Sequence, residues 1–115
     1  MVSTKDVLDH HLKCFGECNL EATLADYSSD AVLFIPSGVL KGHSAIKAVF
    51  QAFFAEFRKP GTSFTMQHEW VEGDYAYILW TAQTAQNHYD AATDTFVIRD
   101  GKIVAQSFNA KITPK

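Results

Sequence analysis

The chain has 115 residues, of which 47% are hydrophobic and 20% are charged, a composition that is ordinary for a globular protein. This length predicts one domain over residues 1–115, with enough buried surface for a core that needs no disulfide or metal. The net charge is −3 and there is no basic cluster, which excludes an electrostatic nucleic-acid-binding surface. The sequence lacks an N-terminal secretory signal and a membrane-length apolar run, so we expect a cytoplasmic protein without membrane contact.

The N-terminal part of the chain predicts two consecutive helices. Residues 3–17 carry apolar side chains at helical spacing, and Ser3 with Asp6 three positions later is typical of a capping box. Asn19 is a suitable N-cap for a second, shorter helix, and we expect Tyr27 to lie on one side of that helix.

A short strand and a long helix are expected next. Residues 31–35 are an apolar run that stops at Pro36, which is typical of a short strand. Residues 43–58 are the clearest helix, because Pro60 stops it and its apolar side chains fall on one buried face. These side chains are Ile46, Val49, Phe50, Phe53, Phe54 and Phe57.

The C-terminal half predicts four consecutive strands. Residues 64–72 and 75–85 are two strands joined by a Gly73-Asp74 turn. Residues 92–112 are a hairpin, because its Asp100-Gly101 dipeptide favours a two-residue turn. Helices that precede an antiparallel sheet define an α+β protein. We expect a strongly curved, mainly antiparallel sheet that wraps around the Phe-rich helix and encloses a cone-shaped pocket.

Several loose motifs in this order resemble the NTF2-like superfamily (the cystatin-like cone), in particular its small SnoaL-like and ketosteroid-isomerase-like members. The motifs are LEATLADYSSDA at 20–31, GHSAI at 42–46, VEGDY at 71–75 and DTFVIRDGKI at 94–103. The resemblance implies the cone fold over nearly the whole chain. It does not define one function, because this fold supports isomerases, cyclases, dehydratases, epoxide hydrolases and binding domains.

The resemblance transfers catalytic residues only one position at a time. The general-base Asp of the ketosteroid isomerases falls at Ile35, which cannot accept a proton. Their oxyanion donor on the first helix falls near His11, and their protonated carboxylic acid falls at Asp94. The Arg and two Asp of limonene-epoxide-hydrolase-like members are not supplied, because Arg99 faces away from Asp94. The pocket histidines of scytalone-dehydratase-like members could correspond to His68.

The residues themselves indicate the same catalytic candidates. Asp94 shares a strand face with Phe96 and Ile98, where burial would raise its pKa and make it an acid or hydrogen-bond donor. His68 on the presumed inner face, and His11 on the apolar stripe of the first helix, are candidate bases. The structural alternatives are a solvated Asp94 at the end of its strand and histidines that pack in the core with satisfied hydrogen bonds.

The predicted pocket wall is aromatic with a few polar groups that could orient a ligand carbonyl. Its candidate ligand-binding residues are Tyr27, Tyr77, Gln83, Gln106, Phe50, Phe54, Trp70 and Phe96. We expect no cofactor and no metal. His10, Cys14 and Cys18 recur four residues apart, but the helix ends before Cys18 and a fourth ligand is missing. The two cysteines are expected to be free thiols.

A second apolar strand face carries Ile78 and Trp80 with Thr95 and Val97, and we expect it on the outside of the sheet. The resemblance implies a homodimer packed sheet to sheet, which would cover this face.

Two functions remain open. The first is a SnoaL-like isomerase, cyclase or dehydratase that acts on a small, mostly apolar carbonyl compound, with Asp94 as acid or oxyanion donor and His68 or His11 as base. The second is a non-catalytic ligand-binding or accessory domain, which the apolar Ile35 favours.

Overall fold

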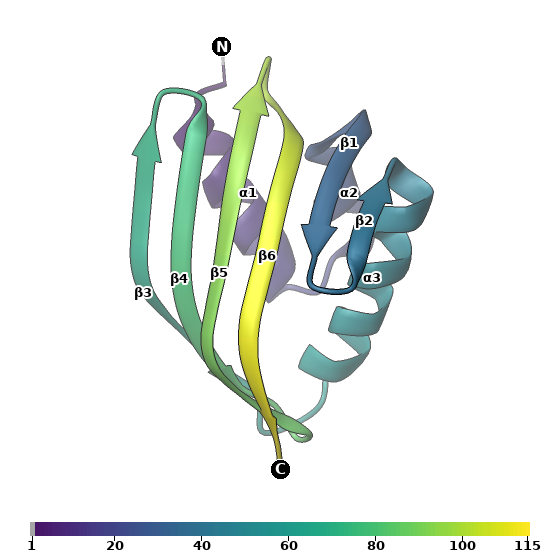
Figure 1. Cartoon of the computed structure of the whole chain (residues 1–115), viewed down its shortest axis with the longest axis vertical. Coiled ribbons are helices and arrows are strands. Elements are labelled where there is room, and N and C mark those ends of the chain that lie inside the picture. The colour runs from purple at the N-terminus through teal and green to yellow at the C-terminus, as the bar shows by residue number, and fades with distance from the viewer. Residues whose placement is uncertain (1) are drawn as a thin grey trace.

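The computed structural model describes residues 2–115, which form three helices and a six-stranded sheet (Figure 1). The helices are α1 (Thr4–Gly16), α2 (Leu20–Ala25) and α3 (His43–Phe57). The strands are β1 (Tyr27–Ile35), β2 (Gly38–Lys41), β3 (Ser63–Glu72), β4 (Tyr75–Gln83), β5 (Asn87–Arg99) and β6 (Lys102–Pro114). They lie in the order β2-β1-β6-β5-β4-β3, with β1 and β6 as the parallel pair of an otherwise antiparallel sheet. The predicted α+β class is confirmed.

Local sequence sets the starts of the first two helices. Ser3 Oγ accepts a hydrogen bond from the backbone N–H of Asp6, and the Asp6 carboxylate accepts one from the backbone N–H of Ser3. Asn19 caps α2 by accepting a hydrogen bond from the backbone N–H of Ala22. Both capping predictions are confirmed.

Within residues 2–115, the helices are too short or too polar to cross a bilayer.

The strand after α2 begins earlier than predicted, and this moves Tyr27. Residues 27–30 belong to β1, so the expectation that Tyr27 lies on the short helix is wrong. Tyr27 pairs with Ile103 of β6, and the polar residues that follow lie where the register shifts before Val32. The pairing of Tyr27 and Val32 with β6 therefore keeps the polar residues between them in the strand, although their local preference is for a turn.

The four C-terminal strands form the predicted meander. Asp100 and Gly101 have φ angles of 52° and 75°, the left-handed values that the two-residue hairpin turn requires. β5 begins at Asn87, five residues before the predicted start, because the polar segment there pairs with the end of β6, as in His88 with Thr113. Figure 1 shows these long strands curving together, which gives the sheet a concave face.

A β-bulge in β3 changes which side chains face the helices. Met66 pairs with Trp80, but His68 pairs with Leu79, so Gln67 is an extra residue in the register. Side-chain alternation therefore reverses at the bulge. His68 and Trp70 lie on the convex face, and the expectation that they share the inner face with Met66 is wrong.

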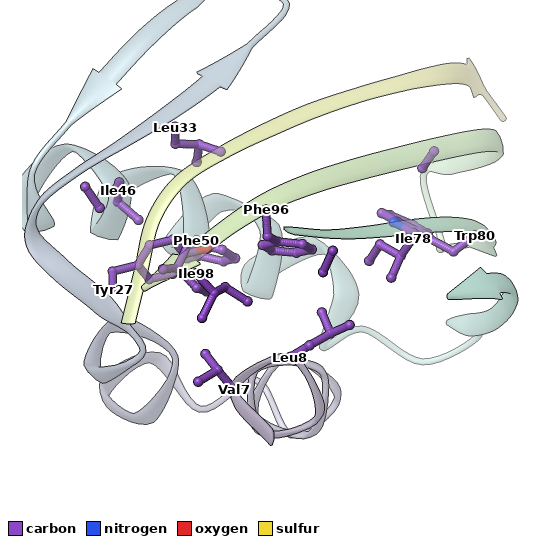
Figure 2. Close-up of a cluster of buried hydrophobic side chains, with 14 of the residues drawn as sticks. Val7, Leu8, Tyr27, Leu33, Ile46, Phe50, Ile78, Trp80, Phe96 and Ile98 are labelled. Atoms are coloured by element: carbon purple, nitrogen blue, oxygen red, sulfur yellow. The ribbon is translucent and has the colours of Figure 1, made fainter. Parts of the chain in front are cut away.

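The concave face carries the residues that were expected outside. Ile78 pairs with Asp94, and Trp80 follows on the same side of β4, so the expectation of an outer face built on Ile78 and Trp80 is wrong. Figure 2 shows Leu8 of α1 directed toward the sheet, and Leu8 belongs to the same buried cluster as Ile78 and Phe96. The core between the sheet and the helices includes Val7, Leu8, Tyr27, Leu33, Ile46, Phe50, Phe54, Ile78, Trp80, Phe96, Ile98 and Ile103.

Candidate functional site

A cavity of about 480 Å³ lies between the concave face of the sheet and helices α1 and α3. Its wall is mostly apolar and aromatic, and the segment 59–63 between α3 and β3 completes it. The wall includes Leu12 and Phe15 from α1, and Val49, Phe50, Phe53 and Phe57 from α3. The sheet adds Leu33, Ile78, Trp80, Asp94, Phe96, Gln106 and Phe108. The titratable side chains on the wall are His11, Cys18, Lys59 and Asp94.

Asp94 is the buried carboxyl group of this wall, with 6% of its surface exposed. Trp80 Nε1 donates a hydrogen bond to Asp94 Oδ2 at 2.9 Å, and Gln106 Nε2 donates one to Oδ1 at 2.8 Å. Burial in the apolar wall raises the pKa of Asp94 to about 6, although these two hydrogen bonds lower it. Asp94 therefore exchanges its proton close to neutral pH.

A relay of hydrogen bonds orients Asp94 from behind. The Tyr27 hydroxyl donates to Gln106 Oε1, which turns the amide so that its Nε2 donates to Asp94. Burial, with the negative charge of Asp94 nearby, raises the pKa of Tyr27 well above its ordinary value, so the hydroxyl stays protonated and remains a donor. Both polar ends of Gln106 are thus used within the protein. Tyr27 is a residue behind the wall and not part of it.

Of the predicted catalytic residues, His11 is the second one that lies on the cavity wall, together with Asp94. It is buried, and its ring makes edge contacts with Tyr27, Phe50 and Phe96 at centroid distances of 5.5–5.9 Å. Burial, with His10 nearby, lowers the pKa of His11 to about 4, so its imidazole is neutral at pH 7. A neutral imidazole can accept a proton or donate a hydrogen bond, depending on its tautomer.

The side chains that could offer ligand atoms to a metal form a cluster behind His11. His10, Cys14 and Asp26 place one such atom each within 4.8 Å of the others. His10 Nδ1 already forms a 2.7 Å hydrogen bond with Asp26 Oδ1, and Cys14 Sγ lies almost equally far from both ring nitrogens of His10. Hydrogen bonds among His10, Cys14 and Asp26 account for the closeness of these three side chains. Cys18 is not part of it.

The structure separates the remaining predicted site residues from the cavity. His68 and Trp70 are exposed on the convex face, where their rings stack at 4.9 Å, so the prediction that His68 is a pocket base is corrected. Tyr77 stacks on Trp70 on the same face. Gln83 is exposed at the end of β4, beside a separate surface groove. Phe54 is buried in the core behind the wall.

Trp80, which sequence reasoning placed outside, proves to be a central residue of the site. The alternation of side chains along β4 contained the signal that Trp80 faces the helices. Residues 76, 78, 80 and 82 are all apolar, whereas the opposite face includes Thr81 and Gln83. The uniformly apolar face is the one that the helices cover.

A curved sheet closed by helices over a mostly apolar cavity defines a small pocket protein of the cone type. Residues 8–106 match the family of SnoaL-like domains, and the chain belongs to this family. No curated protein sequence matches the chain significantly.

Solved structures of low sequence identity share the fold. The epoxide hydrolase/cyclase-like enzyme SalBIII, which acts in pyran ring formation in the polyether salinomycin, superposes with a TM-score of 0.82 at 14% identity, over 97% of this chain and 95% of that chain. An NTF2-like protein of unknown function from Mesorhizobium loti gives 0.79 at 22% identity, over 94% and 90%. A protein from Kribbella flavida, provisionally named a ketosteroid isomerase, gives 0.77 at 13% identity, over 94% and 77%.

Proposed function

We propose that this SnoaL-like protein binds a small, mostly apolar carbonyl compound in its cavity and rearranges it by proton transfer. The observation that carries the proposal is the buried carboxyl group of Asp94, whose pKa of about 6 allows it to hold or release a proton near neutral pH. The cavity volume of about 480 Å³ is within the range of small-molecule sites, and the aromatic wall suits an apolar ring or chain.

The proposed reaction uses His11 as base and Asp94 as acid. His11 takes a proton from the carbon next to the carbonyl group, and the electron pair of that C–H bond moves toward the carbonyl oxygen. Protonated Asp94 donates a proton or a hydrogen bond to this oxygen and so stabilises the enol. The enol proton then returns to Asp94, and the proton on His11 goes to one of three places. Transfer to another carbon gives an isomerised product, and transfer to a departing hydroxyl group releases water and gives a dehydrated product. If the enol carbon instead attacks a second carbonyl carbon of the ligand, transfer to the oxygen of that carbonyl gives a cyclised product. Each Asp94 oxygen accepts one protein hydrogen bond and retains a further site for a proton or ligand.

The names of two similar structures support a reaction of this type. SalBIII is described as epoxide hydrolase/cyclase-like, and the Kribbella protein is provisionally named an isomerase. At identities of 14% and 13%, these structures share the fold with this chain, and the names only indicate the kind of chemistry that the fold can support.

The second candidate is ligand binding without chemistry. Ile35 lines the cavity where the related isomerases have a general base, and both oxygens of Asp94 already have protein donors. In this case Asp94, held in place by Gln106, serves only to orient a polar group of the ligand.

One experiment separates the two functions. A thermal-shift screen with steroid, polyketide and terpenoid carbonyl compounds identifies a ligand, and NMR in D₂O then measures deuterium incorporation next to its carbonyl group. We expect exchange with the wild-type protein and a loss of about 100-fold or more in Asp94→Asn, with binding retained. Asp90→Asn, on the exposed side of the same strand, is the control. Undiminished exchange in Asp94→Asn contradicts the catalytic scheme, and binding without exchange in the wild type supports the second candidate.

We also propose that the protein is a homodimer packed through the convex face. Side chains on this face are apolar and exposed at both of its sides, namely Phe34 and Val39 on β1 and β2, and Trp70 and Tyr75 on β3 and β4. A second copy related by a two-fold axis would cover both groups at once. The sequence-based prediction built this interface on Ile78 and Trp80, but these two residues lie on the concave face and cannot take part in it.

Light scattering after size exclusion tests the dimer at micromolar concentration. We expect a dimer for the wild type and a monomer for Trp70→Lys, because the lysine would bury a charge in the interface. Ile112→Lys is the control, since Ile112 is 44% exposed but pairs with Tyr89 away from this face. A monomeric wild-type protein refutes the proposal.

A further inference from the structure

Two buried polar atoms face each other behind the cavity without a hydrogen-bond partner. His11 Nδ1 and Asp26 Oδ2 are 3.9 Å apart, and neither atom forms a hydrogen bond with the described residues. Asp26 is 8% exposed and His11 is 4% exposed. A buried polar atom without a partner loses its hydrogen bond to water and gains none in return, which is unfavourable for folding. At 3.9 Å the two atoms are too far apart for a hydrogen bond, but the negative charge of a carboxylate acts on the nitrogen across this distance.

The chain holds Asp26 at this place from three sides. Its other carboxyl oxygen, Oδ1, is bound by His10 Nδ1 at 2.7 Å. Its backbone carbonyl accepts a hydrogen bond from Ile103 N at 2.7 Å, which joins the end of α2 to β6. Lys102 Nζ donates to the neighbouring Ala25 carbonyl at 2.6 Å. The carboxylate is therefore fixed on rigid elements, with Oδ2 left for His11.

The ring of His11 is oriented as firmly. Edge contacts with Tyr27, Phe50 and Phe96 surround it, and the residue lies on the cavity wall. Nδ1 is sealed from solvent and lies 3.9 Å from Asp26 Oδ2. The two ring nitrogens point in diverging directions, so Nε2 is directed away from Asp26 when Nδ1 faces it, and His11 lines the cavity.

We propose that Asp26 is a positioning residue that holds His11 in the tautomer with the proton on Nδ1, which leaves the Nε2 lone pair to accept a proton from a ligand. A carboxylate beside Nδ1 attracts the N–H dipole and repels a lone pair, so it selects this tautomer. The role of His11 as a base rests on the proposed function. The tautomer does not, because it follows from contacts within the protein.

The test measures the tautomer directly and needs no substrate. Long-range proton–nitrogen NMR correlations of protein with ¹⁵N-labelled histidine distinguish a protonated from an unprotonated ring nitrogen, and His11→Gln assigns the signals. At pH 7 we expect Nδ1–H for His11 in the wild type. In Asp26→Leu, which removes the carboxylate, the ratio of the Nδ1–H to the Nε2–H form should fall at least about tenfold. His10→Gln should retain the Nδ1–H form, because Asp26 is still present.

The outcomes separate this proposal from the proposed function. An Nε2–H form in the wild type, or an unchanged ratio in Asp26→Leu, overturns the role of Asp26, whatever the protein does with ligands. If Asp26→Leu does not fold, the wild-type spectrum still decides. Once a substrate is known, Asp26→Leu should lower kcat more than it changes KM. Failure to find any turnover counts against the proposed function and leaves the tautomer result unaffected.

Discussion

Replacing Asp94 with asparagine is expected to remove a loss of stability that the wild-type protein undergoes as the pH rises from about 4 to about 6. The folded state raises the pKa of this carboxyl group from 3.8 to about 6, mainly by burial. The unfolded chain therefore releases the proton more readily, and wild-type stability falls as the pH rises from about 4 to about 6. At 1.36 kcal/mol for each pKa unit, this loss amounts to about 3 kcal/mol above pH 6. Asparagine does not ionise and avoids it.

Urea unfolding of both proteins at pH values from 4 to 8 measures this effect. The unfolding free energy of Asp94→Asn minus that of the wild type should rise with pH and level off above pH 6–7. The neighbouring titratable groups interfere little in this range, because His11 has its pKa at about 4 and Tyr27 stays protonated. Cys18 and Lys59, also on the wall, are present in both proteins, so their contribution cancels. A difference that is independent of pH would show that Asp94 is not buried in an apolar site.

Phe54→Ala is expected to be among the most destabilising single changes in α3. Phe54 is 2% exposed and lies in the core outside the cavity wall, so its removal leaves a void that the surroundings fill only in part. Such substitutions cost about 3–5 kcal/mol. Ligand binding by the folded fraction should be unchanged, contrary to the sequence-based assignment of Phe54 to the ligand site.

Phe53→Ala is the matched comparison, one position along the same helix. Phe53 is half-buried and lines the cavity, where the centroid of its ring lies 5.4 Å from that of the Phe108 ring. We expect a smaller loss of stability, roughly 1–2 kcal/mol, together with weaker binding of an apolar ligand. Urea unfolding and ligand titration of both variants measure the two effects. If both variants weaken binding equally, the division between core and wall described above is incorrect.

Local patterns determined most of the secondary structure. The capping box at Ser3 and the cap at Asn19 set the helix starts, and Asp100-Gly101 set the hairpin, because these effects depend on residues a few positions apart. Strand alternation alone placed Asp94 on one face with Phe96 and Ile98, and the structure shows that this face is buried.

Tertiary structure decided the parts that depend on register between distant strands. The first residues of β1 and β5 formed strand where polar residues indicated loops, because each segment pairs with β6. β2 formed after Pro36, where a loop was expected, because it pairs with the preceding strand β1. The bulge at Gln67 turned His68 away from the pocket, and no local signal in β3 marks that position.

The sequence by itself determined the fold class, the aromatic face of α3 and the strand face that Asp94 shares with Phe96 and Ile98. Only the tertiary structure showed which groups surround that carboxyl, namely Trp80 and Gln106 as donors, and that His11 rather than His68 shares the cavity with it. The physical reason is that periodicity assigns a side chain to a face, whereas pairing, bulges and helix packing decide which faces meet.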